Sequence, residues 1–262
     1  MKVLFLGNST DAGSYVPAES KATTMLAGDL ERLYGQPFEI VTRGIWPDSD
    51  LPATVERWME REHPELVYLG VVGWWMTFES VPLKLQRLLG PLGKPTANLG
   101  FRLAETPWIA HTAPFHWGRK LLGRVVGGDP HFTPDEVAES IGQTIRTVLR
   151  HEGTTLVVKG PQHKTRKGYT KAGTRRAEAR RLSCHFALRE LCAEVHVEYI
   201  GSDEPMYPTR SNKGMRIGDR LHANERGHQR RRGELLPYLV RACEIHGLQP
   251  AETEVGAGSG PS

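Results

Sequence analysis

Short apolar runs alternate with longer helical patterns along most of the chain. The apolar runs cover residues 3–6, 38–41, 66–72, 155–158 and 195–200. Continuous apolar runs of this length are typical of parallel strands that are buried on both faces. The helical patterns cover residues 17–33, 51–62, 82–89, 133–151, 171–193 and 224–246. This alternation predicts βαβ units that build a five-stranded parallel sheet with helices on both faces.

The order of these elements predicts an α/β fold, a three-layer α/β/α sandwich with flavodoxin-like strand order. Ligands of such sheets bind at the carboxyl ends of the strands. Residues 1–249 are expected to form a single domain, because the two motifs described below lie near its two ends and would share one site. The tail, residues 250–262, is rich in Gly, Ala, Ser and Pro, which predicts disorder.

The regular pattern fails over residues 90–131. Prolines and large aromatic residues crowd this stretch, which also holds a short amphipathic piece at 118–126: Pro91, Pro95, Pro107, Pro114 and Pro130, with Trp108, Phe115 and Trp117. Long loops without regular structure often serve as lids or binding loops. We therefore expect this insertion to border the ligand site and to exclude water from it.

Composition and charge narrow the class of protein. The chain has 262 residues, of which 39% are hydrophobic and 24% charged, as in ordinary globular proteins. The formal charge of +4 disfavours a nucleic-acid partner. No apolar stretch is long enough to span a bilayer, and the N-terminal apolar run is too short for a signal peptide. Cys184, Cys192 and Cys243 form no C-x-x-C pair, so buried, reduced thiols and a cytoplasmic location are expected.

The first polar loop offers a candidate nucleophile. The first apolar run ends in Gly7-Asn8-Ser9, which puts the Ser9 hydroxyl at the carboxyl edge of the sheet, before a helix. A serine that only makes a turn or caps the helix is the simpler interpretation of this loop taken alone. The loop lacks both the G-x-x-x-x-G-K-[ST] and the G-x-G-x-x-G patterns, so a nucleotide-dependent enzyme is the weakest hypothesis.

A second motif, at residues 218–228, lies just before the last helical pattern and reads G-D-R-L-H-A-N-E-R-G-H. Asp219 precedes His222 by three residues, so its carboxylate can accept the imidazole Nδ1 proton and leave Nε2 facing the site. Taken alone, the pair suits a helix cap and a surface histidine. Together with Ser9 at the same sheet edge, it suits an acyl-transfer triad.

These residues resemble the motifs of the SGNH, or GDSL-type, serine hydrolases. Gly7-Asn8-Ser9 is similar to the first block of that family, with Asn8 in place of the usual Asp, and residues 219–228 are similar to its last block, D-x-x-H-x-N-x-x-G-H. The resemblance covers residues 1–246 and implies an esterase, lipase, thioesterase, carbohydrate deacetylase or acyltransferase without a cofactor. It implies that Ser9 is the nucleophile, His222 the general base and Asp219 the residue that orients the imidazole.

The same resemblance implies an oxyanion hole built from the Ser9 N–H, a glycine after the second strand and an asparagine after the third. Gly44 matches the glycine. The third block departs from the family, because residues 71–79 read V-V-G-W-W-M-T-F-E and contain no asparagine. Three outcomes are expected: an N–H near Gly73 takes the place of this donor, the side chain of Asn98 does so, or the enzyme is slow or altered. Loss of one such donor costs about 10²–10³ in rate.

The residues around this block have two interpretations. Trp74, Trp75 and Phe78 suit either the core or an aromatic wall that contacts the substrate. Glu79 is expected to be a solvated carboxylate or one at the start of a helix. His111, His116 and His131 lack metal-ligand spacing, so we predict no metal site.

A basic stretch follows the fourth apolar run. Residues 159–181 carry nine basic side chains against the single acid Glu178, a net charge of +8. Such runs are usually a solvated helix face. The alternative is a docking site, with Arg166 and Lys167 at the edge of the site, for a phosphate-bearing acyl donor, an acidic carrier protein or an anionic sugar.

Three functions follow from the sequence. The first is a hydrolase of small-molecule acyl esters that acts through an acyl-Ser9 intermediate. The second is an acyltransferase that passes the acyl group to an alcohol or amine. The third is a non-catalytic binding module with a basic face, against which the retained Ser9, Asp219 and His222 argue.

Overall fold

The computed structural model describes residues 1–8, 15–90, 128–161, 171–201, 214–215 and 223–251. At its centre lies a parallel sheet of five strands in the order β2-β1-β3-β4-β5. The strands are β1 (Lys2–Gly7), β2 (Glu39–Gly44), β3 (Leu66–Gly70), β4 (Thr155–Lys159) and β5 (Glu198–Ile200). The predicted α/β fold with flavodoxin-like order is confirmed.

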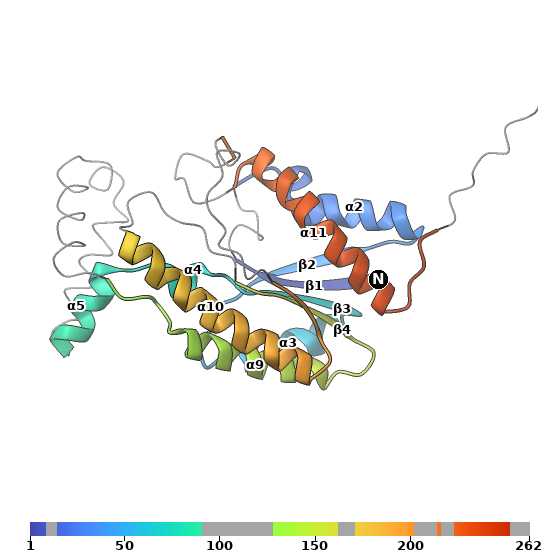
Figure 1. Cartoon of the computed structure of the whole chain (residues 1–262). Helices are drawn as coiled ribbons and strands as arrows, with labels where there is room; N and C mark the ends of the chain where they lie inside the picture. Colours follow the sequence, from blue (N-terminus) through green and yellow to red (C-terminus); the bar gives the residue numbers. More distant parts are fainter. Residues whose placement is uncertain (9–14, 91–127, 162–170, 202–213, 216–222, 252–262) are drawn as a thin grey trace, which may run out of the picture.

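Helices cover both faces of the sheet, as predicted (Figure 1). On one face lie α2 (Ala22–Tyr34) and α11 (Glu225–Ile245), and on the other lie α3 (Leu51–Glu62), α9 (Pro134–Leu149) and α10 (Lys171–Glu194). The remaining described helices are η1 (Ala18–Ser20), α4 (Trp74–Thr77) and α5 (Val81–Leu89). A capping box begins α9, where Thr133 and Glu136 bond to each other's backbone N–H groups.

Three strand boundaries differ from the sequence prediction by two residues or more. β2 continues to Gly44, and β3 ends at Gly70 because the chain then turns into the short helix α4, which the apolar pattern did not predict. β5 begins only at Glu198, since His196 has a left-handed backbone (φ 55°) and the Val197 N–H still bonds to the Cys192 carbonyl at the end of α10.

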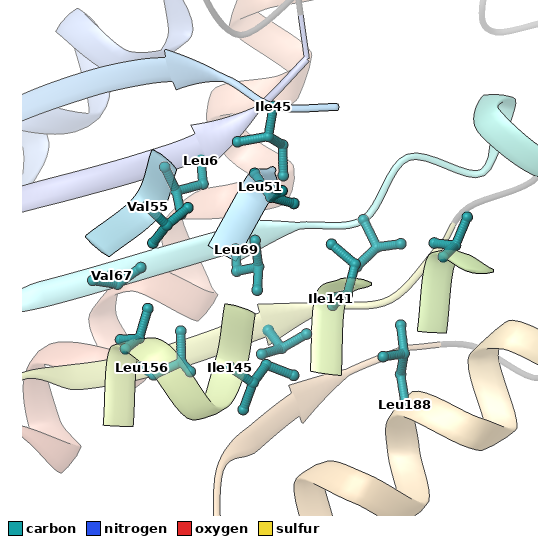
Figure 2. Close-up of a cluster of buried hydrophobic side chains, with 14 of the residues drawn as sticks. Leu6, Ile45, Leu51, Val55, Val67, Leu69, Ile141, Ile145, Leu156 and Leu188 are labelled. Atoms are coloured by element: carbon teal, nitrogen blue, oxygen red, sulfur yellow. The ribbon is translucent and has the colours of Figure 1, made fainter. Parts of the chain in front are cut away.

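The core consists of two layers, one on each side of the sheet. The side chains of β1 alternate between them, with Leu4 and Leu6 in one layer and Val3 and Phe5 in the other. Figure 2 shows the first layer, in which the sheet packs against α3, α9 and α10; the labelled side chains are Leu6, Ile45, Leu51, Val55, Val67, Leu69, Ile141, Ile145, Leu156 and Leu188. The second layer packs against α2 and α11.

All three cysteines are buried and free, as the sequence predicted. Burial raises the pKa of the Cys184 and Cys192 thiols to about 12 and that of Cys243 to about 11. Because the thiolate is the reactive form, these residues behave as small core side chains. None of the described helices combines the length and the apolar character needed to cross a bilayer.

An ion pair between a buried carboxylate and a partly exposed arginine joins α2 to α11. Asp29, which is 4% exposed, accepts two hydrogen bonds from the Arg232 guanidinium, one of them from Nη2 at 2.6 Å. Arg32 also donates to Asp29 at 2.5 Å, but its side chain is 74% exposed. The Arg232 pair therefore contributes more than the Arg32 pair, since exposed pairs are screened by solvent.

Loss of the Asp29 carboxylate is expected to destabilise the fold. Asp29→Ala should lower the free energy of unfolding by about 2–3 kcal/mol, because it removes charge-assisted hydrogen bonds at a buried position. For a chain of this size, that change lowers the Tm by roughly 4–10 °C. Thermal unfolding measures it, with Arg32→Ala as the control, which should cost under about 1 kcal/mol. Equal losses in the two variants would contradict this role of the Asp29–Arg232 pair.

Candidate active site

The first motif lies at the carboxyl end of the two strands nearest one sheet edge. Gly7, the last residue of β1, pairs in register with Gly44, the last residue of β2. The Ile45 N–H continues the ladder by donating to the Gly7 carbonyl at 2.9 Å. The chain that leads to Ser9 therefore leaves the sheet beside the chain that follows Gly44.

α2 begins at the carboxyl end of the strands, because it leads from the end of β1 back to the start of β2. α11 runs parallel to α2, so its N-terminus lies at the same end of the sheet. The Ala22 N–H at the start of α2 donates to His228 in the first turn of α11 (3.2 Å). Near the other end of the pair, the Tyr34 hydroxyl donates to the Val240 carbonyl (3.2 Å). The helix after the first motif and the helix after the last motif thus begin side by side (Figure 1).

Asn224 forms the N-cap of α11 and holds the chain on both sides of residues 216–222. Its Oδ1 accepts the Gly227 N–H at 3.0 Å, and its Nδ2 donates to the Gly214 carbonyl at 2.8 Å. Its own N–H donates to the Met215 carbonyl at 3.1 Å. In the sequence, one residue, Ala223, separates this anchored asparagine from His222.

Several predicted site residues lie outside the described part of the chain: Ser9, Asp219, His222, Arg166, Lys167 and Asn98. Their predicted roles stay predictions. The structure describes Asn8, directly before Ser9, and Ala223, directly after His222. It also describes Gly44, Gly73, Trp74 and Trp75.

The two oxyanion-hole glycines have different surroundings. Gly44 is exposed, and a Cβ at this position would meet no atom of the described residues within 4 Å. Packing against the described residues therefore does not require a glycine at the end of β2. Gly73 is buried at the N-cap of α4, where its carbonyl accepts the Thr77 hydroxyl at 2.7 Å.

An aromatic cluster lies where the chain leaves β2 and β3. The two predicted tryptophans, Trp74 and Trp75, are buried in it to different degrees. Trp75 is 2% exposed and packs in the core, whereas Trp74 is only partly buried. Trp74 stacks on Phe78 (ring centroids 5.2 Å apart) and on His131 (4.7 Å). Trp46, which follows Gly44 by two residues and is 41% exposed, contacts Trp74 at 6.0 Å. Of the predicted pair, Trp74 is therefore the more exposed.

Sequence reasoning missed the contribution of His131 and Phe132 to this cluster. The Trp46 ring contacts His131 at 5.5 Å and Phe132 at 5.2 Å, in both cases edge to face. Burial, and then the nearby Arg87 charge, lower the pKa of His131, which favours the neutral imidazole in this stack. In the sequence, the only indication that these two residues belong to the cluster was their position just before Thr133, the N-cap of α9.

Hydrogen bonds hold the end of the irregular stretch next to this cluster. Ser80 and Asp129 exchange backbone hydrogen bonds of 2.8 and 3.1 Å, and Arg87 donates to the Asp129 carboxylate at 3.2 Å. The Phe132 N–H donates to the Trp75 carbonyl at 3.2 Å. These bonds fix the approach of His131 to the Trp74 ring.

The described part of the basic stretch is largely paired within the protein. Glu79 accepts hydrogen bonds from Arg180 at 2.9 Å and Arg176 at 3.4 Å, and Arg181 donates to Glu178 at 2.6 Å. Of the two expectations for Glu79, a solvated carboxylate was wrong, because its side chain is only 13% exposed and bonds to α10. Its position at the start of a helix is confirmed, since it directly precedes Ser80, the N-cap of α5. These pairs reduce the charge that α10 offers to an anion.

Lys159, the first residue of the basic stretch, is a buried lysine. It ends β4 and is 6% exposed. Because side chains alternate along a strand, it lies on the same side of the sheet as Val157, the side covered by α2 and α11. This places a lysine at the carboxyl edge of the sheet, on the side covered by the helices that follow the two motifs.

Comparison with solved structures identifies the architecture. The psychrotrophic esterase EstA from Pseudoalteromonas sp. superposes with a TM-score of 0.54 at 9% identity over 93% of this chain and 98% of its own. The chain has the SGNH hydrolase fold. TesA superposes with a TM-score of 0.53 at 14% identity, over 94% of this chain and 99% of its own. A member of the lipolytic G-D-S-L family from Veillonella parvula gives 0.51 at 11% identity, over 92% and 99%.

At these identities, the SGNH fold is what the superpositions share with this chain. Neither a scan against protein-family models nor a search of curated protein sequences found a match. Among the described residues, no three His, Cys, Asp or Glu side chains gather as a metal site would require. The chemistry therefore has to be argued from the residues at the sheet edge.

Proposed function

We propose that the protein is an SGNH-type serine hydrolase that cleaves small-molecule acyl esters through an acyl-Ser9 intermediate. The observation that carries this proposal is the parallel start of α2 and α11, joined by the bond from the Ala22 N–H to His228. The first motif leads into α2 and the last motif into α11. Residues far apart in the sequence thereby approach the same end of β1, which supports a shared site for Ser9, Asp219 and His222.

The proposed reaction has two acyl-transfer steps. The Ser9 hydroxyl attacks the ester carbonyl carbon while His222 Nε2 takes its proton, and Asp219 holds the Nδ1–H of the imidazolium. Collapse of the tetrahedral intermediate breaks the bond to the alcohol, which leaves with the proton from His222. Water then attacks the acyl-Ser9 ester with His222 as base, and the acid is released with Ser9 restored.

The oxyanion hole is proposed to use the N–H groups of Ser9 and Gly44. An N–H near Gly73 or the side chain of Asn98 is the proposed third donor in place of the family's asparagine. The proposed roles of Ser9, Gly44 and the aromatic cluster fit together, because Trp46 follows Gly44 by two residues and contacts Trp74 after β3. A substrate held by these donors would lie against the two rings.

The substrate class follows from these surroundings. The faces and edges of Trp46 and Trp74 favour an apolar or planar group on the ester. The anionic alternative, with Arg166 and Lys167 as contacts, loses the support of Arg176, Arg180 and Arg181, because these three side chains are paired internally. Uncharged aryl or alkyl esters are therefore the first substrates to test.

Rapid mixing with p-nitrophenyl acetate tests the covalent mechanism. We expect a burst of p-nitrophenol of about one equivalent of enzyme, followed by slower turnover, because the acyl-enzyme accumulates. Added hydroxylamine or an alcohol separates the two catalytic hypotheses: faster release of the acyl group by the acceptor than by water supports the acyltransferase. A folded protein with neither a burst nor turnover would support the binding module.

Replacement of Gly44 tests its proposed contact with the substrate. Gly44→Ala should lower kcat/KM by about 10²-fold, because a methyl group would displace the reacting carbonyl. Its thermal stability should stay equal or rise slightly, since no atom of the described residues lies within 4 Å of the added methyl group and the unfolded chain loses entropy. The matched control is Gly28→Ala in α2, also in open space, which should keep wild-type kinetics. Wild-type kinetics in Gly44→Ala would remove Gly44 from the proposed oxyanion hole.

A further inference from the structure

The last motif contains an asparagine, a glycine and a second histidine that the proposed chemistry does not use. His228 is 1% exposed, and its Nδ1 lies 3.2 Å from the Ala22 amide nitrogen, which is 206 positions away in the sequence. Since that amide can only donate, Nδ1 accepts, and the neutral ring carries its proton on Nε2. Residue 228 must therefore have a hydrogen-bond acceptor where His228 has Nδ1.

This bond satisfies a group that α2 cannot satisfy by itself. The first amides of a helix have no partner within the helix and usually bond to a capping side chain. The N-cap of α2 is Lys21, whose side chain makes no capping bond. A side chain from α11 thus supplies the cap of α2, and the first turns of the two helices are fixed relative to each other.

Gly227 brings the preceding chain close to the same turn. A Cβ on Gly227 would lie 2.3 Å from the Met215 carbonyl oxygen, so any larger residue would push the backbone at 214–215 away. Asn224 bonds to both residues of that backbone. The chain that enters and leaves residues 216–222 is therefore anchored to the first turn of α11, which is itself bonded to the first turn of α2.

We propose that His228, together with Asn224 and Gly227, is a positioning residue that sets the placement of His222 and Asp219 relative to Ser9. This inference rests on the proposed function. In this proposal, the second part of the last motif (N-x-x-G-H, residues 224–228) positions the catalytic groups, whereas the first part (D-x-x-H, residues 219–222) carries out the chemistry. The bond to Ala22 joins the helix after the nucleophile loop to the helix after the loop of the base.

The test compares three variants by kcat, KM and the rate of Ser9 labelling by a fluorophosphonate. His228→Ala should lower kcat and the labelling rate by about 10–100-fold with little change in KM, because reacting groups are displaced while substrate contacts remain. His228→Asn should recover most of the loss, because Asn Oδ1 occupies nearly the place of His Nδ1 and accepts the same bond. Gly227→Ala should lower kcat as His228→Ala does, by a separate route.

The matched control weakens the same helix pair farther from the sheet edge. Asp29→Ala removes the Arg232 bonds and should lower the Tm, yet keep kcat within about twofold at a temperature where it is folded. Wild-type kcat and labelling in His228→Ala, or equal losses in His228→Ala and His228→Asn, would overturn the positioning role alone. A folded wild type that neither turns over esters nor reacts at Ser9 would overturn the proposed function, and this inference with it.

Discussion

Ser9→Ala is expected to lower kcat for ester hydrolysis by about 10⁴–10⁶-fold. The variant keeps the proposed oxyanion donors and substrate contacts but has no hydroxyl to form the acyl intermediate. A residual rate above that in water is expected, because oxyanion stabilisation and binding act without the nucleophile. KM should change little, since the hydroxyl contributes mainly to the transition state.

The control for this variant is Ser49→Ala. Ser49 is an exposed serine in the loop after β2, and its hydroxyl contacts only Asp50, at 3.5 Å, among the bonds of the described chain. Its replacement should leave kcat and KM at wild-type values. Equal activity of Ser9→Ala and wild type would exclude Ser9 as the nucleophile, whatever the fate of the fold.

His222→Ala should cause a loss of similar size, and Asp219→Asn one on the order of 10⁴-fold. The imidazole accepts a proton only when it is neutral, so wild-type kcat/KM should fall as the pH is lowered and level off at higher pH. Asp219→Asn should lower the plateau, because the amide no longer accepts the Nδ1 proton and the ring is held in the wrong tautomer. Initial rates between pH 5 and 9 measure both effects.

His151 provides the control for the histidine. It lies at the far end of α9, and its Nε2 contacts Glu56 at 3.1 Å. His151→Ala should keep the wild-type pH profile. A flat rate from pH 5 to 8 in the wild type, or an unchanged profile in His222→Ala, would contradict the assignment of His222 as general base.

Local patterns predicted the parts of the fold that depend on neighbouring residues. The buried runs identified all five strands and their parallel order, and Thr133 and Asn224 begin their helices as their sequence context indicates. The errors also have local causes. α4 is too short to show helical periodicity, and the left-handed His196 delays β5 within an apolar run.

The candidate site was predictable only in part, because its contacts join distant segments. The register of Gly7 with Gly44 follows from parallel pairing of two predicted strands. The stack of His131 on Trp74, the ion pairs of Glu79 with α10 and the bond from Ala22 to His228 link residues with no local relation in the sequence. The sequence around a polar residue gives no indication of which distant partner it meets, so a solvated carboxylate was one of the two expectations for Glu79.

The central claim is that Ser9 is a nucleophile activated by His222 within a folded site. Mapping of a fluorophosphonate adduct by mass spectrometry tests it most directly. The account predicts a single adduct on the peptide that contains Ser9, absent in Ser9→Ala, greatly slowed in His222→Ala and absent after denaturation. A folded wild-type protein that acquires no adduct at Ser9, or one that is labelled as fast after denaturation as before it, would contradict the claim.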